Sequence, residues 1–198
     1  FLNGGYDRLM SRVTRHDYSA EFADGGRLGL DLDWNYERLT EPFEIMRGVM
    51  VPAGEYRFAQ AIPSYSSDRS RWLSGNLRMT LGQFWDGGIT GIETGARVRV
   101  NEHLATSGSY ARNHVTLPEG EFIATVGRFR VDYSFSTRMF LNAFLQYNSA
   151  TRSWLSNVRF NFIHRPLSDI FVVYNDTRGA LRSPGRALIV KYTHLISF

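Results

Sequence analysis

The chain contains no cysteine, only six prolines and a single lysine among its 198 residues. Without cysteine it can form neither a disulfide framework nor a Cys-ligated zinc site, and it has no thiol nucleophile. It also lacks any run of about 18 consecutive apolar residues, the length that a transmembrane helix requires. These absences exclude disulfide-stabilised, thiol-dependent and helical membrane classes for this stretch of sequence.

The positive charge is spread thinly along the chain. The formal net charge is +4, and because Lys191 is the only lysine, nearly all of the cations are arginines. A basic chain raises the question of nucleic acid. Here, however, the arginines stand singly beside acidic residues, with no Lys/Arg run. We therefore interpret them as residues on the polar faces of strands and expect no nucleic-acid partner.

Apolar and polar residues alternate with a period of two through most of the chain, which predicts β-strands. Eleven such segments begin near residues 10, 27, 55, 71, 89, 103, 120, 137, 152, 168 and 186. Each is roughly 10 to 14 residues long, whereas soluble strands usually have ~5–6. A tilted strand needs about 9–11 residues to cross a bilayer. The lengths therefore favour membrane-spanning strands.

The connections between these segments fall into two sets. The set "ADGG", "SSDRS", "VNEH", "SFSTR" and "RPLSD" alternates with "TEPFEIMRGVMVPAG", "QFWDGG", "VTLPEGE", "NSATRS" and "DTRGALRSPG", most of which are longer. Outer-membrane barrels have short periplasmic turns and longer outer loops. The alternation therefore predicts a periplasmic C-terminus.

The two faces of the predicted strands differ in chemistry. Charges in the middle of a strand are costly in a dry core but compatible with a wet lumen, and aromatic residues near strand ends match the girdles of membrane barrels. The predicted lumen charges are Asp31, Asp33, Arg78, Glu93, Arg97, Arg99, Arg128, Arg130, Asp132, Arg159 and Lys191. The predicted lipid-facing or interface residues are Leu28, Leu30, Leu32, Trp34, Phe129, Val131, Tyr133, Phe135, Trp154, Phe160, Phe162, Tyr192, Ile196 and Phe198.

Together these features predict an all-β fold, an antiparallel transmembrane β-barrel with about eleven strands in this chain. It would lie in the outer membrane of a Gram-negative bacterium, in contact with outer-membrane lipid. The alternative is a soluble sandwich or propeller with one face of each strand in a core. Single-chain bacterial barrels have an even number of strands. We therefore expect residues 1–198 to be one barrel region, the C-terminal part of a larger barrel.

The closing stretch "RALIVKYTHLISF" sets apolar or aromatic residues at alternate positions and ends in Phe198. It resembles the closing strand of bacterial outer-membrane proteins, whose C-terminal aromatic residue is read by the barrel assembly machinery. The resemblance implies that Tyr192, Ile196 and Phe198 face lipid. It also implies that the assembly machinery is a partner.

Longer stretches resemble the bacterial family known as domain of unknown function 5916. They are "ERLTEPFEI" with "VPAGEYRF" (37–58), "SDRSRWLSG" (67–75), "GQFWDGG" (82–88), "VTLPEGEF" (115–122) and "FLQYNSATRSWLSNVRFNFIHRPLSDIFVVYND" (144–176). Members join an N-terminal carbohydrate-binding family 9-like β-sandwich to a long C-terminal region expected to form a barrel. The resemblance implies that N-terminal strands and this sandwich are missing here. It also implies a membrane anchor or an uptake channel in a glycan- or peptide-related system.

The chain carries no recognisable catalytic or metal-binding pattern. Its five histidines lie far apart, without H-E-x-x-H or H-x-H spacing. Asp31 and Asp33 resemble a glycosidase pair or a Ca²⁺ site, but their spacing follows from strand alternation, and arginines on neighbouring strands would neutralise them. We expect no catalytic residues, metal or cofactor in this chain. The alternatives are the membrane part of a surface hydrolase whose catalytic residues lie elsewhere, and a soluble β-rich binding module.

Two further expectations concern solute passage. The segment "EPFEIMRGVMVPAG" (41–54) is apolar for an outer loop. It would either fold inward as a plug or constriction, or dock on another outer-membrane or surface protein. An open lumen carrying the six predicted arginines would favour anionic solutes.

Overall fold

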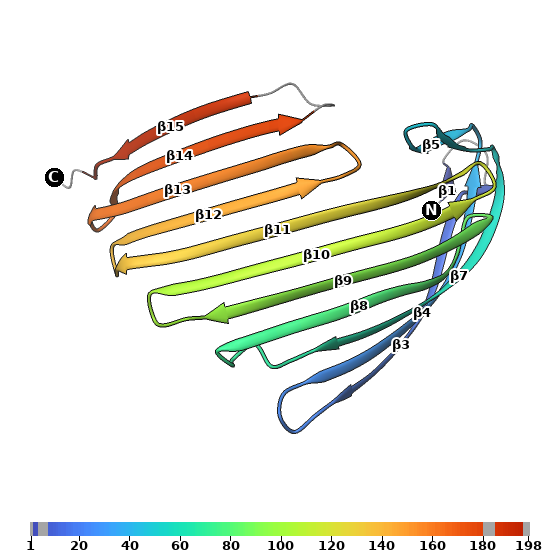
Figure 1. Cartoon of the computed structure of the whole chain (residues 1–198), viewed down its shortest axis with the longest axis horizontal. Helices are drawn as coiled ribbons and strands as arrows, with labels where there is room; N and C mark the ends of the chain where they lie inside the picture. The colour runs from blue at the N-terminus through green and yellow to red at the C-terminus, as the bar shows by residue number, and fades with distance from the viewer. Residues whose placement is uncertain (1, 4–7, 180–184, 196–198) are drawn as a thin grey trace. The chain divides into compact units, whose positions relative to one another are not determined.

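An eleven-stranded antiparallel sheet dominates the fold (Figure 1). The computed structural model describes residues 2–3, 8–179 and 185–195. The sheet has the order β15-β14-β13-β12-β11-β10-β9-β8-β7-β4-β3, so strands adjacent in the main sheet follow one another along the chain. Its strands are β3 (Ser11–Glu21), β4 (Arg27–Leu39), β7 (Gly54–Ser66), β8 (Leu73–Phe84), β9 (Gly87–Arg99), β10 (Leu104–Leu117), β11 (Gly120–Ser136), β12 (Met139–Asn148), β13 (Ser153–Arg165), β14 (Ser168–Gly179) and β15 (Gly185–Thr193).

Two short pairs accompany this sheet. Strand β1 (Leu2–Asn3) pairs with β2 (Arg8–Leu9), and β5 (Phe43–Met46) pairs with β6 (Val49–Val51). The all-β antiparallel prediction is confirmed, and each of the eleven predicted segments is a strand of the main sheet. Strands β3 and β15 are its two edges. Closure into a barrel therefore stays a prediction.

The expected rhythm of the connections is wrong in part. Only residues 85–86 join β8 to β9, and only residues 118–119 join β10 to β11. Both were expected among the outer loops, "VTLPEGE" as a longer connection and "QFWDGG" as an only slightly longer one. The strands extend into both "QFWDGG" and "VTLPEGE". In the first of these, Trp85 lies in the left-handed region (φ 55°), a conformation that permits a two-residue hairpin connection. Loop length therefore no longer supports the predicted orientation, apart from the long connection 40–53.

The chain divides into two compact units. The first unit comprises residues 1–68, 76–94 and 111–124, and the second comprises residues 69–75, 95–110 and 125–198. No helix among the residues described is long and apolar enough to span a bilayer.

The buried apolar cluster of the first unit is built around the 43–51 hairpin, formed by β5 and β6. Val49 and Val51 of the hairpin pack with Val115 and Leu117 of β10, and Val51 is fully buried. The partly buried residues packed on the cluster are Leu39, Ile45, Met46, Tyr56, Phe84, Trp85, Ile89 and Phe122. The hairpin thus packs against strands of the main sheet, which agrees with the predicted inward folding of residues 41–54. Docking of this segment on another protein stays a prediction.

Candidate functional site on the polar face

Each unit has an apolar and a polar strand face, because residues directly opposite in an antiparallel pair share a face. In the first unit, Leu28, Leu30, Leu32 and Trp34 of β4 lie opposite Tyr65, Pro63, Ala61 and Ala59 of β7. Leu28 is 50% exposed and Trp34 is 48% exposed. The four predicted lipid-facing residues of β4 therefore share one apolar, uncovered face.

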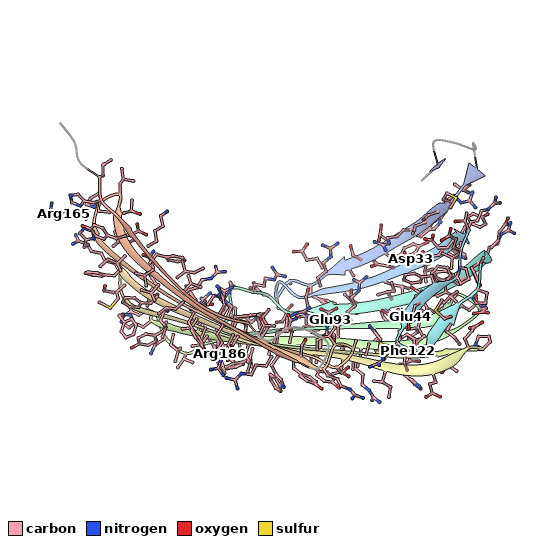
Figure 2. The ribbon with its side chains drawn as sticks, turned by 90° about the horizontal axis from the view of Figure 1, so that it is seen from above. Asp33, Glu44, Glu93, Phe122, Arg165 and Arg186 are labelled. Carbon is pink, nitrogen blue, oxygen red and sulfur yellow. The ribbon has the colours of Figure 1, made fainter. Side chains whose placement is uncertain are left out.

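The polar face of the first unit holds its charges in ion pairs. Arg15 of β3 donates from Nε and Nη2 to the two carboxylate oxygens of Asp33, both at 2.7 Å, and Asp33 is buried. Arg78 of β8 donates to Asp31 at 3.0 Å. The expected neutralisation by arginines is confirmed for both carboxylates, but only Arg15 comes from a neighbouring strand, since β7 lies between β8 and β4. Figure 2 labels Asp33 of β4 and, on β9, the predicted lumen residue Glu93.

The 43–51 hairpin lies over this polar face. Tyr56 and Phe58 of β7 lie on that face, opposite Glu37 and Asn35 of β4. Both rings pack with Trp85; the distance between ring centroids is 5.0 Å for Tyr56 and 6.0 Å for Phe58. Tyr56 and Trp85 in turn pack against the hairpin cluster. The apolar loop therefore covers part of the polar face and leaves the apolar face bare.

The second unit repeats the two faces. Directly opposite pairs on its apolar face include Phe129–Leu145, Val131–Ala143, Tyr133–Leu141, Tyr147–Trp154, Phe160–Val172, Phe162–Ile170 and Ile170–Tyr192. Phe135, at a bulge, packs on Tyr133 with ring centroids 4.6 Å apart. Every described member of the predicted lipid-facing set therefore lies on the apolar face of its unit. Ile196 and Phe198 lie outside the described residues.

Five of the predicted lumen charges lie on the polar face of the second unit, on β11, β13 and β15. Arg128, Arg130 and Asp132 of β11 lie opposite Gln146, Phe144 and Asn142 of β12. Arg159 of β13 lies opposite Asn142, and Lys191 of β15 lies opposite Phe171. On β9, Arg97 and Arg99 alternate with Ala96 and Val98, and Arg99 contacts the Ser70 carbonyl at 3.4 Å.

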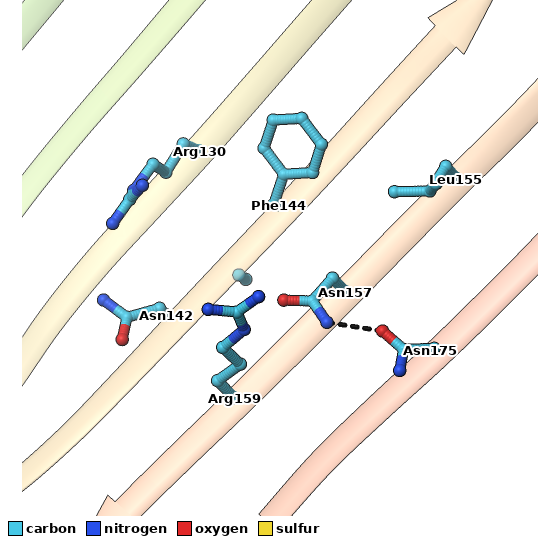
Figure 3. A pocket seen from close by; sticks show the side chains of 8 residues that line it. Arg130, Asn142, Phe144, Leu155, Asn157, Arg159 and Asn175 are labelled. Atoms are coloured by element: carbon cyan, nitrogen blue, oxygen red, sulfur yellow. Dashed lines mark hydrogen bonds between the residues drawn. The ribbon is translucent and has the colours of Figure 1, made fainter. Parts of the chain in front are cut away.

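Four strands of the second unit form a shallow pocket of about 400 Å³ on the polar face (Figure 3). Its lining residues are Arg130, Asn142, Ala143, Phe144, Leu155, Asn157, Arg159 and Asn175. The sheet register brings them together, since Asn142 is opposite Arg159 and Asn157 is opposite both Phe144 and Asn175.

Hydrogen bonds fix several of the pocket's polar groups. Arg130 Nε donates to both oxygens of Asp132, at 2.8 and 2.9 Å, and Asn142 Nδ2 donates to Asp132 at 2.6 Å. Asn157 Nδ2 donates to Asn175 Oδ1 at 2.5 Å. Arg159 is exposed and has no hydrogen-bond or ion-pair partner among the described residues. The pocket therefore presents one unpaired guanidinium group beside amide groups and the Phe144 ring.

These groups suit an anionic, hydroxyl-bearing ligand. A guanidinium group binds carboxylate or phosphate through two parallel hydrogen bonds. Asparagine amides can both donate to and accept from hydroxyl groups, and an aromatic ring offers a flat apolar contact. No group of three or more histidine or acidic side chains suited to a metal ion occurs among the described residues.

Sequence reasoning found the two pocket arginines but missed the remaining lining residues. It also missed Arg15 as the partner of Asp33. Asn142, Asn157 and Asn175 have the parity of the predicted polar face, and this signal would have placed them beside Arg159 once the strand pairing was known. Phe144 was missed because an aromatic residue on a polar face breaks the pattern.

Comparisons with known proteins do not assign the chain to a family. No known family matches the chain, and no curated protein matches it. The chain is similar in structure to the KdgM porin and to the KdgM porin in complex with disordered oligogalacturonate. Each match has 14% sequence identity and a TM-score of 0.39, and covers 94% of this chain and 100% of the other. A similarity at this TM-score carries no functional argument.

Proposed function

We propose that the chain forms the wall of a β-barrel in the outer membrane of a Gram-negative bacterium, with its polar face along a path for anionic solutes. One observation carries the proposal: the apolar face of each unit is uncovered, while the polar face is charged. Large apolar and aromatic side chains remain exposed on the apolar face. Examples are Leu28 and Trp34 in the first unit and Leu188 (66%) and Tyr192 (62%) in the second. Such surfaces are rare on monomeric soluble proteins and are the rule in membrane barrels.

The strand dimensions support the same proposal. From Leu28 to Tyr36 the apolar face of β4 covers eight residue steps, roughly 26 Å at about 3.3 Å per residue. At the ~40° tilt of barrel strands this length spans about 20 Å of an apolar band that is about 25 Å tall. Strands of 9 to 17 residues are long enough to cross that band with a tilt.

The residues of the polar face favour, as the transported solute, an anion that also carries hydroxyl or amide groups. Arg159 is unpaired among the described residues, and Arg130 keeps part of its fork of donors beyond its Nε contact with Asp132. In the sheet register, Asn157 belongs to the row of Arg130 and Asn142 to the row of Arg159. An acidic sugar or an acidic peptide would use both kinds of group, and the chain would act as an uptake channel or an anchor for such a system.

The test is ion selectivity in planar bilayers. Replacing both pocket arginines (R130Q with R159Q) is expected to shift the anion-to-cation permeability ratio towards one, because the fixed positive charge along the path falls by two. R138Q, in the turn between β11 and β12, removes a charge outside the pocket and is expected to keep the wild-type ratio. An unchanged ratio in the pocket variant would refute the anionic path.

Membrane insertion is tested separately by a heat-modifiability gel on detergent-extracted protein. A faster-migrating band before boiling is expected, because a closed barrel stays compact in detergent. A protein that remains soluble without detergent and shows no shift would contradict the barrel and favour a soluble β-rich binding module.

A further inference from the structure

The apolar face of the first unit ends in a row of basic residues at the end near the 43–51 hairpin. Tyr36 of β4 lies directly between Arg12 of β3 and Arg57 of β7. The guanidinium carbon of Arg57 is 5.7 Å from the centre of the Tyr36 ring. Tyr36 is buried while both arginines are exposed. The row therefore presents two cations on either side of one phenol ring.

The charges of Arg12 and Arg57 are not cancelled by a neighbouring carboxylate. Glu55, the acidic residue of the next row, accepts a hydrogen bond from Arg38 at 2.5 Å. Arg38 also donates to the Tyr36 hydroxyl at 3.2 Å. Within the part of the chain that the structure describes, neither Arg12 nor Arg57 has an ion-pair partner. An anion is thus the missing complement of this row.

The residues around the row form a site with an apolar side. Arg12, Thr14, Trp34, Tyr36, Arg57 and Gln83 line most of a pocket of about 270 Å³. The next row towards the other end of the strands is Thr14–Trp34–Ala59, followed by His16–Leu32–Ala61 and Tyr18–Leu30–Pro63. The surface therefore changes from cationic to aromatic to apolar within a few residue steps.

The opposite end of this face lacks such a row. There Ala20 and Tyr65 lie on either side of Leu28, and the adjacent Arg27 alternates to the polar face, opposite Ser66. The arginines thus mark one end of the apolar face only. Such a one-sided distribution of arginines is expected where the boundary of the apolar layer at that end carries anionic groups.

The second unit contains a related but weaker arrangement. Trp154 on its apolar face lies between Tyr147 and Arg178, and the next row places Asp176 opposite Arg186. Asp176 pairs with Arg178 at 2.7 Å, so this arrangement carries less uncompensated charge. The site of the first unit is the stronger of the two.

We propose that Arg12 and Arg57 bind the phosphate group of an anionic lipid, whose acyl chains lie along the apolar rows beyond Trp34. This inference rests on the proposed membrane location. Guanidinium groups hold phosphate through paired hydrogen bonds, and tryptophan is the residue of membrane interfaces. The apolar rows beside the cations favour a lipid phosphate over free phosphate, because they offer the acyl chains a surface.

The experiment has two stages, which separate failure of the membrane location from failure of the lipid site. First, flotation of the full chain with phosphatidylcholine vesicles tests insertion, and a protein that stays in the dense fraction overturns the membrane proposal itself. Second, native mass spectrometry of the detergent-solubilised chain measures the dissociation constants of phosphatidic acid, phosphatidylcholine and inorganic phosphate.

Phosphatidic acid is expected to bind most tightly. One arginine near an anionic lipid surface contributes a factor of about five, so R12Q with R57Q is expected to bind phosphatidic acid about 25-fold more weakly. R138Q with R165Q removes the same charge from the turn between β11 and β12 and from the last residue of β13, and is expected to keep wild-type binding. Equal binding by the two double variants overturns the proposal. Equally tight binding of inorganic phosphate overturns the lipid as the source.

Discussion

Replacing Val51 by alanine tests whether the 43–51 hairpin is held on the polar face by its apolar cluster. Val51 is fully buried, and its cluster neighbours are Val49, Val115 and Leu117. The substitution removes two methyl groups, each worth about 0.8 kcal/mol of transfer free energy. The cavity left behind adds to this cost. We expect the docked hairpin to lose roughly 2 kcal/mol.

The assay is limited trypsin digestion of the detergent-solubilised chain. Arg47 lies between β5 and β6, and cleavage after it yields a fragment of defined mass. When opening is fast relative to cleavage, the cleavage rate follows the population of the opened hairpin. A loss of about 2 kcal/mol corresponds to a roughly 30-fold faster cut, with 1.4 kcal/mol per factor of ten in population.

The matched control is Val100→Ala, the same chemical change at a residue that is 57% exposed. Its cleavage rate after Arg47 is expected to equal that of the wild type. If Val51→Ala and Val100→Ala are cut after Arg47 at the same rate, the cluster does not hold the hairpin, and its proposed role as a cover of the polar face is refuted.

Two further substitutions test the ion pairs and the sheet packing of the first unit. Asp33→Ala leaves Arg15 without its bidentate partner. We expect the free energy of unfolding to fall by about 2 kcal/mol, since hydrogen bonds to charged groups contribute ~1.5–3 kcal/mol. A heat-modifiability midpoint equal to that of the wild type would contradict this. In Gly87→Ala the added Cβ would lie 1.9 Å from the Thr116 carbonyl oxygen, so β9 must move away from β10 and the refolded yield should fall. Gly127→Ala, whose Cβ would meet nothing within 4 Å, should refold like the wild type, and equal yields for the two glycine variants would count against the close approach.

The covered polar face and the bare apolar face give the chain a consistent chemistry. The long apolar connection 40–53 packs inward on the polar face at one end of the first unit, and the row of Arg12 and Arg57 lies on the opposite face near the same end. We expect that end to meet the headgroups of the leaflet that supplies the bound anionic lipid, with the hairpin narrowing the solute path beside it.

The alternation of residues by itself determined the strands and the two faces. Successive side chains of an extended chain point to opposite sides, so the grouping of Leu28, Leu30 and Trp34 against Asp31 and Asp33 depends only on local geometry. The same local rule placed every described residue of the predicted lipid-facing set on the apolar face. It also located all eleven strands of the main sheet.

Contacts between strands were decided only by the tertiary structure. Arg78 and Asp31 are 47 positions apart, and the pocket residues Asn142, Arg159 and Asn175 come from three strands. Such contacts depend on the register, and a slip of one residue would change every partner. The turn at Trp85 and the inward fold of the 43–51 hairpin depend likewise on packing against residues distant in sequence. Period-two alternation carries no information about either.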